Sequence, residues 1–75
     1  MKSFLIDLSI AENVKKFVDS MGKYAFDVDL RAGRYVVDAK SILGIFSLDL
    51  SKPITIEIYA EDLSGIMEDI KPFLV

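Results

Sequence analysis

A short and almost wholly apolar segment lies in the middle of this chain and limits the folds available to it. The segment begins at Ser41 and ends near Leu48. Serine is a preferred N-cap residue, so the sequence predicts a helix that starts directly after Ser41. Only about eight residues separate Ser41 from Asp49, so this helix spans about 12 Å at about 1.5 Å per residue. It is too short to cross over a sheet.

Four segments alternate between apolar and polar residues, which is typical of strands with one buried face. The sequence predicts strands over residues 4–8, 24–30, 34–39 and 54–59. Arg31–Gly33 is the predicted turn between the second and third strands, with Gly33 free to take a positive φ. Because this connection is so short, those two strands are expected to be antiparallel. In the fourth strand, we expect the side chains on one face to point at the helices: Ile54, Ile56 and Ile58.

Two longer segments show the spacing of amphipathic helices. Ser9 and Glu12 form a capping-box pattern that predicts the start of the first helix, and Gly22 is its predicted C′ residue. Pro72 is expected to terminate the second helix. The predicted apolar face of the first helix contains Ile10, Val14, Phe17, Val18 and Met21, and that of the second contains Leu63, Ile66, Met67 and Ile70.

The order β-α-β-β-α-β-α predicts an α+β fold of two layers. Each strand has one apolar face and each long helix has one apolar stripe, so the helices should cover one face of a four-stranded antiparallel sheet. We therefore expect an open-faced β-sandwich, with three helices on one face, in a single domain over residues 1–75.

Composition excludes several classes of function. The chain has no cysteine, which excludes disulfides and Cys-based metal sites. Its net charge is −3 and it has no basic stripe, which argues against direct binding of nucleic acid. Asp7 interrupts the first apolar stretch, and no run approaches a membrane span. We expect a cytoplasmic protein.

No pattern of residues indicates a cofactor, a metal site or an enzyme. Asp27 and Asp29 lie on the same face of a predicted strand, but hard-metal sites usually need more oxygen ligands. We expect both to face solvent, with Arg31 and Arg34 nearby to balance their charge. The chain also lacks histidine and a glycine-rich phosphate loop, so catalysis would have to rest on carboxylates without a recognisable partner.

The run from Asp38 to Leu50 resembles the regulatory-serine region of HPr, the phosphocarrier of the bacterial sugar phosphotransferase system. The family pattern is Lys-Ser-(Ile/Leu)-(Met/Leu)-Gly-(Val/Ile)-(Met/Phe)-Ser-Leu, and residues 40–48 read Lys-Ser-Ile-Leu-Gly-Ile-Phe-Ser-Leu. Phe17 and Val18 fit the Phe-Val of the family's first helix. The resemblance implies an HPr-like domain.

HPr carries its phosphoryl group on a histidine, and this chain has none. With Phe17-Val18 as the anchor, the family motif Gly-Leu-His-(Ala/Thr)-Arg-Pro-Ala falls on residues 8–13 and beyond, where Ile10 stands at the histidine position and Glu12 at the arginine position. Isoleucine has no nucleophilic atom, and a carboxylate repels an incoming phosphate. We expect no phosphocarrier reaction.

The same resemblance gives Ser41 a second role beside capping. In HPr of many Gram-positive bacteria the matching serine is phosphorylated by a dedicated kinase, and the phosphoprotein then binds a transcriptional regulator. A phosphate is favoured at a helix N-terminus, and Lys40 adds a neighbouring positive charge. Ser41 is therefore a candidate phosphorylation site.

The short helix is also a candidate partner surface. Its four large apolar residues cannot all face inward on two turns, and exposed apolar patches usually mark interfaces. The leading hypothesis is a non-catalytic, HPr-like adaptor that binds a protein partner, such as the kinase or the regulator, through this helix. The expected partner-binding residues are Lys40, Ile42, Leu43, Phe46 and Ser47.

Two alternatives come from other classes. One is a small-molecule sensing module of the ACT type, a ferredoxin-like fold that binds an amino acid between dimerised sheets and needs a longer second helix. The other is a structural homodimer without a ligand.

Overall fold

Four short strands form one antiparallel sheet in the computed structural model, which describes residues 1–75. The edge strands are β1 (Lys2–Ile6) and β3 (Tyr35–Asp38), and β4 (Ile54–Ile58) and β2 (Val28–Ala32) lie between them. The order across the sheet is β1-β4-β2-β3, with every pair antiparallel. The last strand of the chain therefore fills the gap between the first two.

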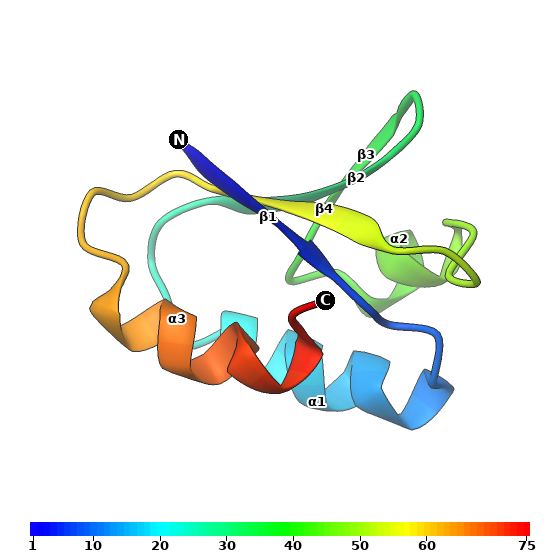
Figure 1. The fold of residues 1–75 in the computed structure, drawn as a ribbon, viewed down its shortest axis with the longest axis horizontal. Helices are drawn as coiled ribbons and strands as arrows, with labels where there is room; N and C mark the ends of the chain where they lie inside the picture. Colours follow the sequence, from blue (N-terminus) through cyan, green and yellow to red (C-terminus); the bar gives the residue numbers. More distant parts are fainter.

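The helices form the second layer (Figure 1). α1 (Ala11–Met21) and α3 (Ser64–Ile70) contact each other and lie along the same side of the sheet, and α2 (Ile42–Phe46) contacts α1. A 3₁₀ helix, η1 (Lys71–Phe73), follows α3 directly. The predicted α+β class and element order are confirmed. α2 has only five residues, so the ferredoxin-like alternative is not the observed fold. None of the helices is long and apolar enough to span a bilayer.

The core lies between the two layers. Ile54, Ile56 and Ile58 of β4 each have at most 1% of their surface exposed, which confirms the alternation predicted for this strand. Burying a side chain of this size contributes about 1.5–3 kcal/mol. From the helical layer, the ring of Phe17 meets that of Phe73 edge to face, with centroids 5.5 Å apart and planes at 89°. The isoleucines of β4 are buried in the core beneath the helices, and the aromatic contact joins α1 to η1 within the helical layer.

The β2–β3 hairpin turns one residue later than predicted. β2 continues through Ala32, which pairs with Tyr35, so the loop is Gly33-Arg34 rather than Arg31–Gly33. Gly33 has a φ of 61° and Arg34 does not have a positive φ. A positive φ at the first loop residue alone is the pattern of a type II′ turn, whose twist matches that of the flanking strands.

The predicted second strand is too long at its start. The sequence indicated residues 24–30, but β2 begins at Val28. Tyr24 and Phe26 are partly buried against the core, which produces the apolar alternation without a strand. Their backbone carbonyls accept hydrogen bonds from the ammonium group of Lys40 at 2.6 and 2.9 Å, so these carbonyls bind a side chain instead of a neighbouring strand.

The predicted capping box at the start of α1 is wrong. The N-cap residue is Ile10, in an extended conformation and without a side-chain hydrogen bond to the helix. The backbone N–H of Ser9 donates to Oδ1 of Asp7 at 2.8 Å, so Ser9 belongs to the preceding turn and lies one residue too early to cap. Ile10 is also not part of the apolar face, because its side chain is 60% exposed.

The two long helices end close to the predicted residues, but Gly22 does not adopt the expected capping conformation. Gly22 closes α1 in a right-handed conformation, with a φ of −62°, so the left-handed cap that a C′ glycine often provides is not used. α3 ends at Ile70, just before Pro72, as the sequence predicts, and Pro72 itself lies inside η1. Proline is compatible with the first turn of a helix, where its missing N–H is not needed.

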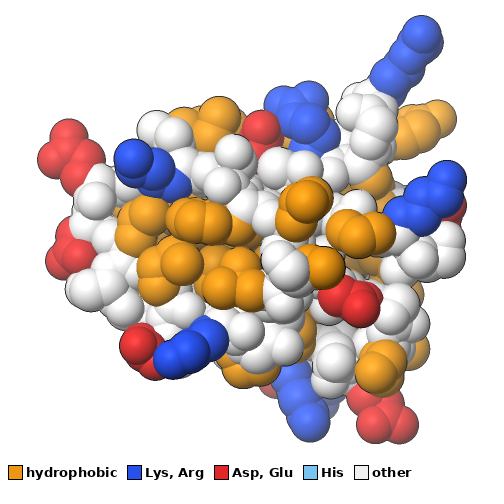
Figure 2. Space-filling model, in the orientation of Figure 1, with side chains coloured by type: hydrophobic (Ala, Val, Ile, Leu, Met, Phe, Trp, Pro, Cys, Tyr) orange, Lys and Arg blue, Asp and Glu red, His pale blue; other side chains and the backbone are white.

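The C-terminal residues lie along the free edge of β1 (Figure 1). The N–H of Asp7 donates to the carbonyl of Phe73 at 2.8 Å, and the N–H of Val75 donates to the carbonyl of Leu5 at 3.2 Å. These bonds cover part of an edge strand that would otherwise present unpaired backbone groups. Figure 2 shows hydrophobic side chains gathered in the middle of this face of the molecule, with charged side chains around them.

Candidate functional site

α2 is the element that the sequence singled out, and Ser41 fixes its start. Ser41 is extended, with φ −106° and ψ 109°, and its Oγ accepts a hydrogen bond from the N–H of Gly44 at 3.1 Å. This is the geometry of an N-cap and confirms the predicted cap. The helix ends after one and a half turns, where the exposed hydroxyl of Ser47 donates to the carbonyl of Gly44 at 2.5 Å.

The apolar side chains of α2 divide between the core and the surface. Ile45 is completely buried. Leu43 is 81% exposed, Phe46 is 48% exposed and Ile42 is 38% exposed. We call these three residues the α2 surface. Its exposure follows from helix geometry, because residues at consecutive positions are spread around the axis and one short helix cannot bury all of them.

Lys40 is placed differently from the other residues expected to bind a partner. It is half-buried, and its ammonium group donates to the carbonyls of Tyr24 and Phe26. Its backbone N–H donates to Oδ1 of Asp38 at 2.8 Å. Lys40 therefore ties the β3–α2 connection to the segment before β2, and its charge is engaged within the protein.

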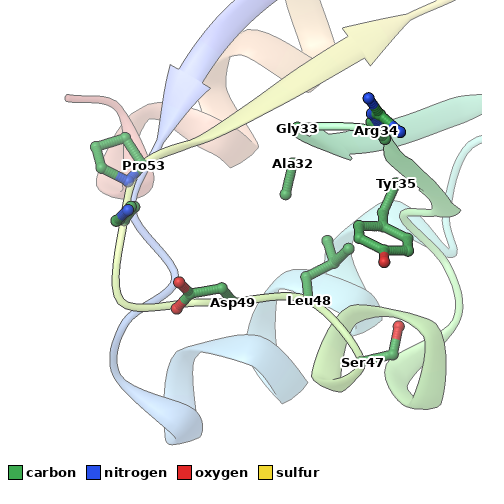
Figure 3. Close-up of a pocket in the computed structure, with 9 residues that line it drawn as sticks. Ala32, Gly33, Arg34, Tyr35, Ser47, Leu48, Asp49 and Pro53 are labelled. Atoms are coloured by element: carbon green, nitrogen blue, oxygen red, sulfur yellow. The ribbon is translucent and has the colours of Figure 1, made fainter.

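A cavity of about 610 Å³ opens beside Ser47 (Figure 3). It lies between the tip of the β2–β3 hairpin and the segment that joins α2 to β4. Figure 3 shows the ring of Tyr35 with its hydroxyl directed toward Ser47 and with Leu48 beside it. The sequence gives no signal of this cavity, because the hairpin and the loop meet only in the fold. The lining residues are Ala32, Gly33, Arg34, Tyr35, Ser47, Leu48, Asp49, Lys52 and Pro53.

The start of α1, which the resemblance to HPr indicates as the position of the carrier histidine, is formed in this chain by Ile10 and Glu12. Ile10 is the N-cap residue with its hydrocarbon side chain largely exposed. Glu12 lies exposed in the first turn. Both residues are exposed, and the first turn of α1 lies toward the same end of the molecule as α2 (Figure 1). Isoleucine has no nucleophilic atom that could accept a phosphoryl group, and the negative charge of Glu12 repels an approaching phosphate.

Asp29 is the acidic residue of β2 and lies on the open face of the sheet, whereas Asp27 precedes the strand. Asp29 stands opposite Asp38 of β3 and Glu57 of β4. Partial burial, followed by the nearby charges of Asp38 and Glu57, raises the pKa of Asp29. Arg31 does not bind Asp29 but donates through Nε and a terminal nitrogen to both carboxylate oxygens of Glu57, each at 3.2 Å. No three acidic side chains converge as metal ligands would.

The family model described as "PTS HPr component phosphorylation site" matches residues 11–74. The chain belongs to the HPr family. This confirms the resemblance seen around Ser41. HPr proteins are phosphocarriers of the sugar phosphotransferase system rather than enzymes, and they interact with other proteins of that system. The matched residues begin directly after Ile10. A comparison with curated protein sequences gives no match.

Solved HPr structures share the fold. The phosphocarrier protein HPr from Bacillus anthracis str. Ames is 24% identical, with a TM-score of 0.76, over 96% of this chain and 93% of that chain. HPr-C-His from Thermoanaerobacter tengcongensis is 23% identical, with a TM-score of 0.75, over 95% of this chain and 92% of that chain. At these identities the likeness establishes the architecture alone.

Proposed function

We propose that this HPr-family protein is a regulatory adaptor that carries no phosphoryl group on histidine and binds a protein partner through the α2 surface. The observation that carries the proposal is the exposure of Leu43, 81%, on a helix whose Ile45 anchors it in the core. A large aliphatic side chain held rigidly on the surface, with Ile42 and Phe46 next to it, is the kind of anchor that interfaces use.

The lack of a carrier group supports the adaptor role. The chain contains no histidine, and the surface at the start of α1 is formed by Ile10 and Glu12. A phosphate approaching there would meet a hydrocarbon side chain and a negative charge. In this proposal the protein has no enzymatic activity and acts by presenting a surface, as a single HPr-like domain over residues 1–75 in the cytoplasm.

Ser41 is the proposed point of regulation. Its hydroxyl is half-buried at the start of α2, directly beside the α2 surface. Phosphorylation would add about 1.5–2 negative charges at this position, and a phosphate oxygen could accept the Gly44 N–H in place of the hydroxyl. The partners that fit are a serine kinase and a transcriptional regulator that binds the modified protein. Lys40 would position Ser41 through its anchored side chain, and Ser47 would border the contact.

The experiment uses the HPr serine kinase of a Gram-positive bacterium with ATP, followed by mass spectrometry. We expect one phosphate on Ser41, none on Ser41→Ala, and normal labelling of Ser47→Ala. The phosphoprotein is then titrated with the catabolite regulator by calorimetry, and Leu43→Ser is expected to abolish binding without lowering the melting temperature. Tight binding of the regulator by Leu43→Ser would contradict the proposal that the α2 surface binds the partner. Loss of binding accompanied by a lower melting temperature would contradict it as well, because Leu43 would then act through the fold.

A second assay tests the absence of carrier activity. The protein is incubated with phosphoenolpyruvate and the general phosphotransferase enzyme, with a histidine-containing HPr as the positive control. We expect an acid-labile phosphoprotein in the control only. Labelling of this chain would show that another group accepts phosphate and would overturn the adaptor assignment. Analytical ultracentrifugation of the same sample tests the homodimer alternative.

A further inference from the structure

The cavity beside Ser47 has the size and chemistry of a small-molecule site that lies outside the α2 surface. Its volume of about 610 Å³ is within the range of about 300–1,000 Å³ that ligand pockets occupy. Two parts of the chain form it: the hairpin tip at residues 32–35 and the loop at residues 47–53. The cavity shares only Ser47 with the expected partner-binding residues, so it can be tested separately.

Two cations border this cavity and neither forms an ion pair. Arg34 comes from the hairpin and Lys52 from the loop, and neither side chain makes a hydrogen bond or an ion pair within the protein, whereas Lys23 and Arg31 both form salt bridges. The single carboxylate of the lining, Asp49, accepts hydrogen bonds at Oδ1 from the N–H and the hydroxyl of Ser51. These bonds lower the pKa of Asp49, and Lys52 lies close enough to that carboxylate to help lower it. The lining therefore carries one net positive charge in a protein whose overall charge is −3, which favours an anionic ligand.

The rest of the lining fits a ring that carries hydroxyl groups. The Tyr35 side chain is 71% exposed, and its ring borders the cavity next to Leu48 (Figure 3). An aromatic face of this kind stacks on a flat or apolar ring surface. Oδ2 of Asp49 takes no part in the bonds to Ser51 and is free to accept a hydrogen bond from a ligand hydroxyl.

We propose that this cavity binds a phosphate monoester of a hydroxylated ring. The phosphate lies between Arg34 and Lys52, because guanidinium and ammonium groups bind phosphate by charge-assisted hydrogen bonds. The ring stacks on Tyr35, and its hydroxyls donate to Asp49. Nucleotides and sugar phosphates share this chemistry. The site goes beyond the adaptor role proposed above and does not depend on it.

The test is an NMR titration of the ¹⁵N-labelled full chain with four probes: AMP, ribose 5-phosphate, adenosine and inorganic phosphate. AMP and ribose 5-phosphate are expected to shift the amide signals of residues 33–35 and 47–52 in a saturable way. Adenosine, which lacks the phosphate, should bind at least about tenfold more weakly. Tighter binding of AMP than of ribose 5-phosphate identifies a nucleotide site, and equal binding identifies a sugar-phosphate site. Inorganic phosphate that binds as well as either ester, or the lack of saturable shifts at these amides, would overturn the proposal.

Variants distinguish specific binding of the phosphate ester in the cavity from general attraction between the anionic ligand and positive charges on the protein. Arg34→Met and Lys52→Met are each expected to weaken binding about tenfold through the loss of a charge-assisted bond, and Tyr35→Leu should weaken ring binding while leaving inorganic phosphate unaffected. All three side chains are exposed, so the fold should persist, and the amide spectrum verifies this. Lys15→Met and Lys16→Met remove the same charge from the exposed side of α1. An equal loss in these controls would show that binding depends on net charge alone and would refute the site.

Discussion

The hydroxyl oxygen of Ser41 accepts a hydrogen bond from the backbone N–H of Gly44 at 3.1 Å. This bond closes the first turn of α2, and the small size of Gly44 permits it. A Cβ added at Gly44 would lie 3.3 Å from Oγ of Ser41 and 3.3 Å from Cβ of Val37. The glycine thus lets α2 lie against β3 while its cap is kept. Together the two residues fix the direction in which the α2 surface points.

Replacing the capping hydroxyl tests this arrangement. Ser41→Ala is expected to lower the free energy of unfolding by about 1 kcal/mol. Ser41→Asp should keep most of this capping contribution, because a carboxylate accepts a hydrogen bond from the same N–H. Urea unfolding measures both. Ser47→Ala, which removes an exposed hydrogen bond from the Ser47 hydroxyl to the carbonyl of Gly44 at the other end of α2, is the comparison and should change stability by less than about 0.5 kcal/mol. Equal losses in Ser41→Ala and Ser41→Asp would contradict a capping role.

Alanine substitutions along α2 separate the core from the surface. Ile45→Ala should cost about 2–5 kcal/mol, since Ile45 is fully buried. Leu43→Ala should cost less than about 0.5 kcal/mol, because its side chain is mostly in solvent. Phe46→Ala is expected to fall between them, at about 1–2 kcal/mol, since about half of the ring is buried. Thermal melts rank the three variants, and a large loss for Leu43→Ala would place that residue in the core.

The alternation of apolar residues explains why much of the fold could be predicted. Ile54, Ile56 and Ile58 face the core as their spacing indicates, because a strand buries every second side chain. The sequence also indicated that α2 is short, although its five residues are fewer than the roughly eight expected. Tyr24 and Phe26 show where the same signal misleads: their side chains pack inward from a loop, and periodicity does not distinguish a loop that packs from a strand that pairs.

Features that depend on residues far apart in the sequence were not predictable. The ammonium group of Lys40 donates hydrogen bonds to carbonyls 14 and 16 residues away. From the sequence, Lys40 was expected only to place a positive charge next to Ser41. Competition between local signals is a second cause of error. Ser9 and Glu12 have the spacing of a capping box, yet Asp7 takes the N–H of Ser9, and the helix starts one residue later. The backbone conformation decides which side chain binds the N–H, and the spacing of residues in a sequence pattern does not specify that conformation.

Asp29 should oppose folding at neutral pH. Its partial burial, with Asp38 and Glu57 on either side, raises its pKa above the ordinary value of 3.8. A carboxyl group whose pKa is raised by folding stabilises the fold below that ordinary value, and this contribution is lost as the pH rises through the folded pKa. Asp29→Asn is therefore expected to raise stability at pH 7, and the gain should shrink as the pH falls toward 3.8. Urea unfolding over a series of pH values measures the difference in stability between Asp29→Asn and the wild type.

The control for net charge is Asp19→Asn, which neutralises an exposed carboxylate on α1. It should give a smaller gain than Asp29→Asn at neutral pH, because Asp19 is not among the charges that raise the pKa of Asp29. A gain for Asp29→Asn that is the same at every pH would show that the amide improves packing or hydrogen bonding, and would exclude the electrostatic explanation.

The hydrogen bond from the Tyr24 hydroxyl to the Asp69 carboxylate joins the segment after α1 to α3, and it should leave two marks on the pH dependence of stability. The bond favours the neutral phenol and raises the pKa of Tyr24 to about 12. Its contribution is present below the ordinary value of 10.0 and is lost as the pH rises toward 12. The same bond, together with Lys23, lowers the pKa of Asp69 below 3.8, so stability is also lost as the pH falls through that lowered value.

Tyr24→Phe removes the bond but keeps the ring, which packs beside Phe26 with centroids 5.2 Å apart. It should cost about 1 kcal/mol in the middle of the pH range. The difference from the wild type should then shrink at both ends, above pH 10 because the phenol ionises and below pH 3.8 because the carboxylate is protonated. Tyr59→Phe removes an exposed hydroxyl that makes no hydrogen bond and serves as the control. If the difference for Tyr24→Phe stays constant through both windows, the loss comes from packing, and the bond between Tyr24 and Asp69 contributes nothing to the link between α1 and α3.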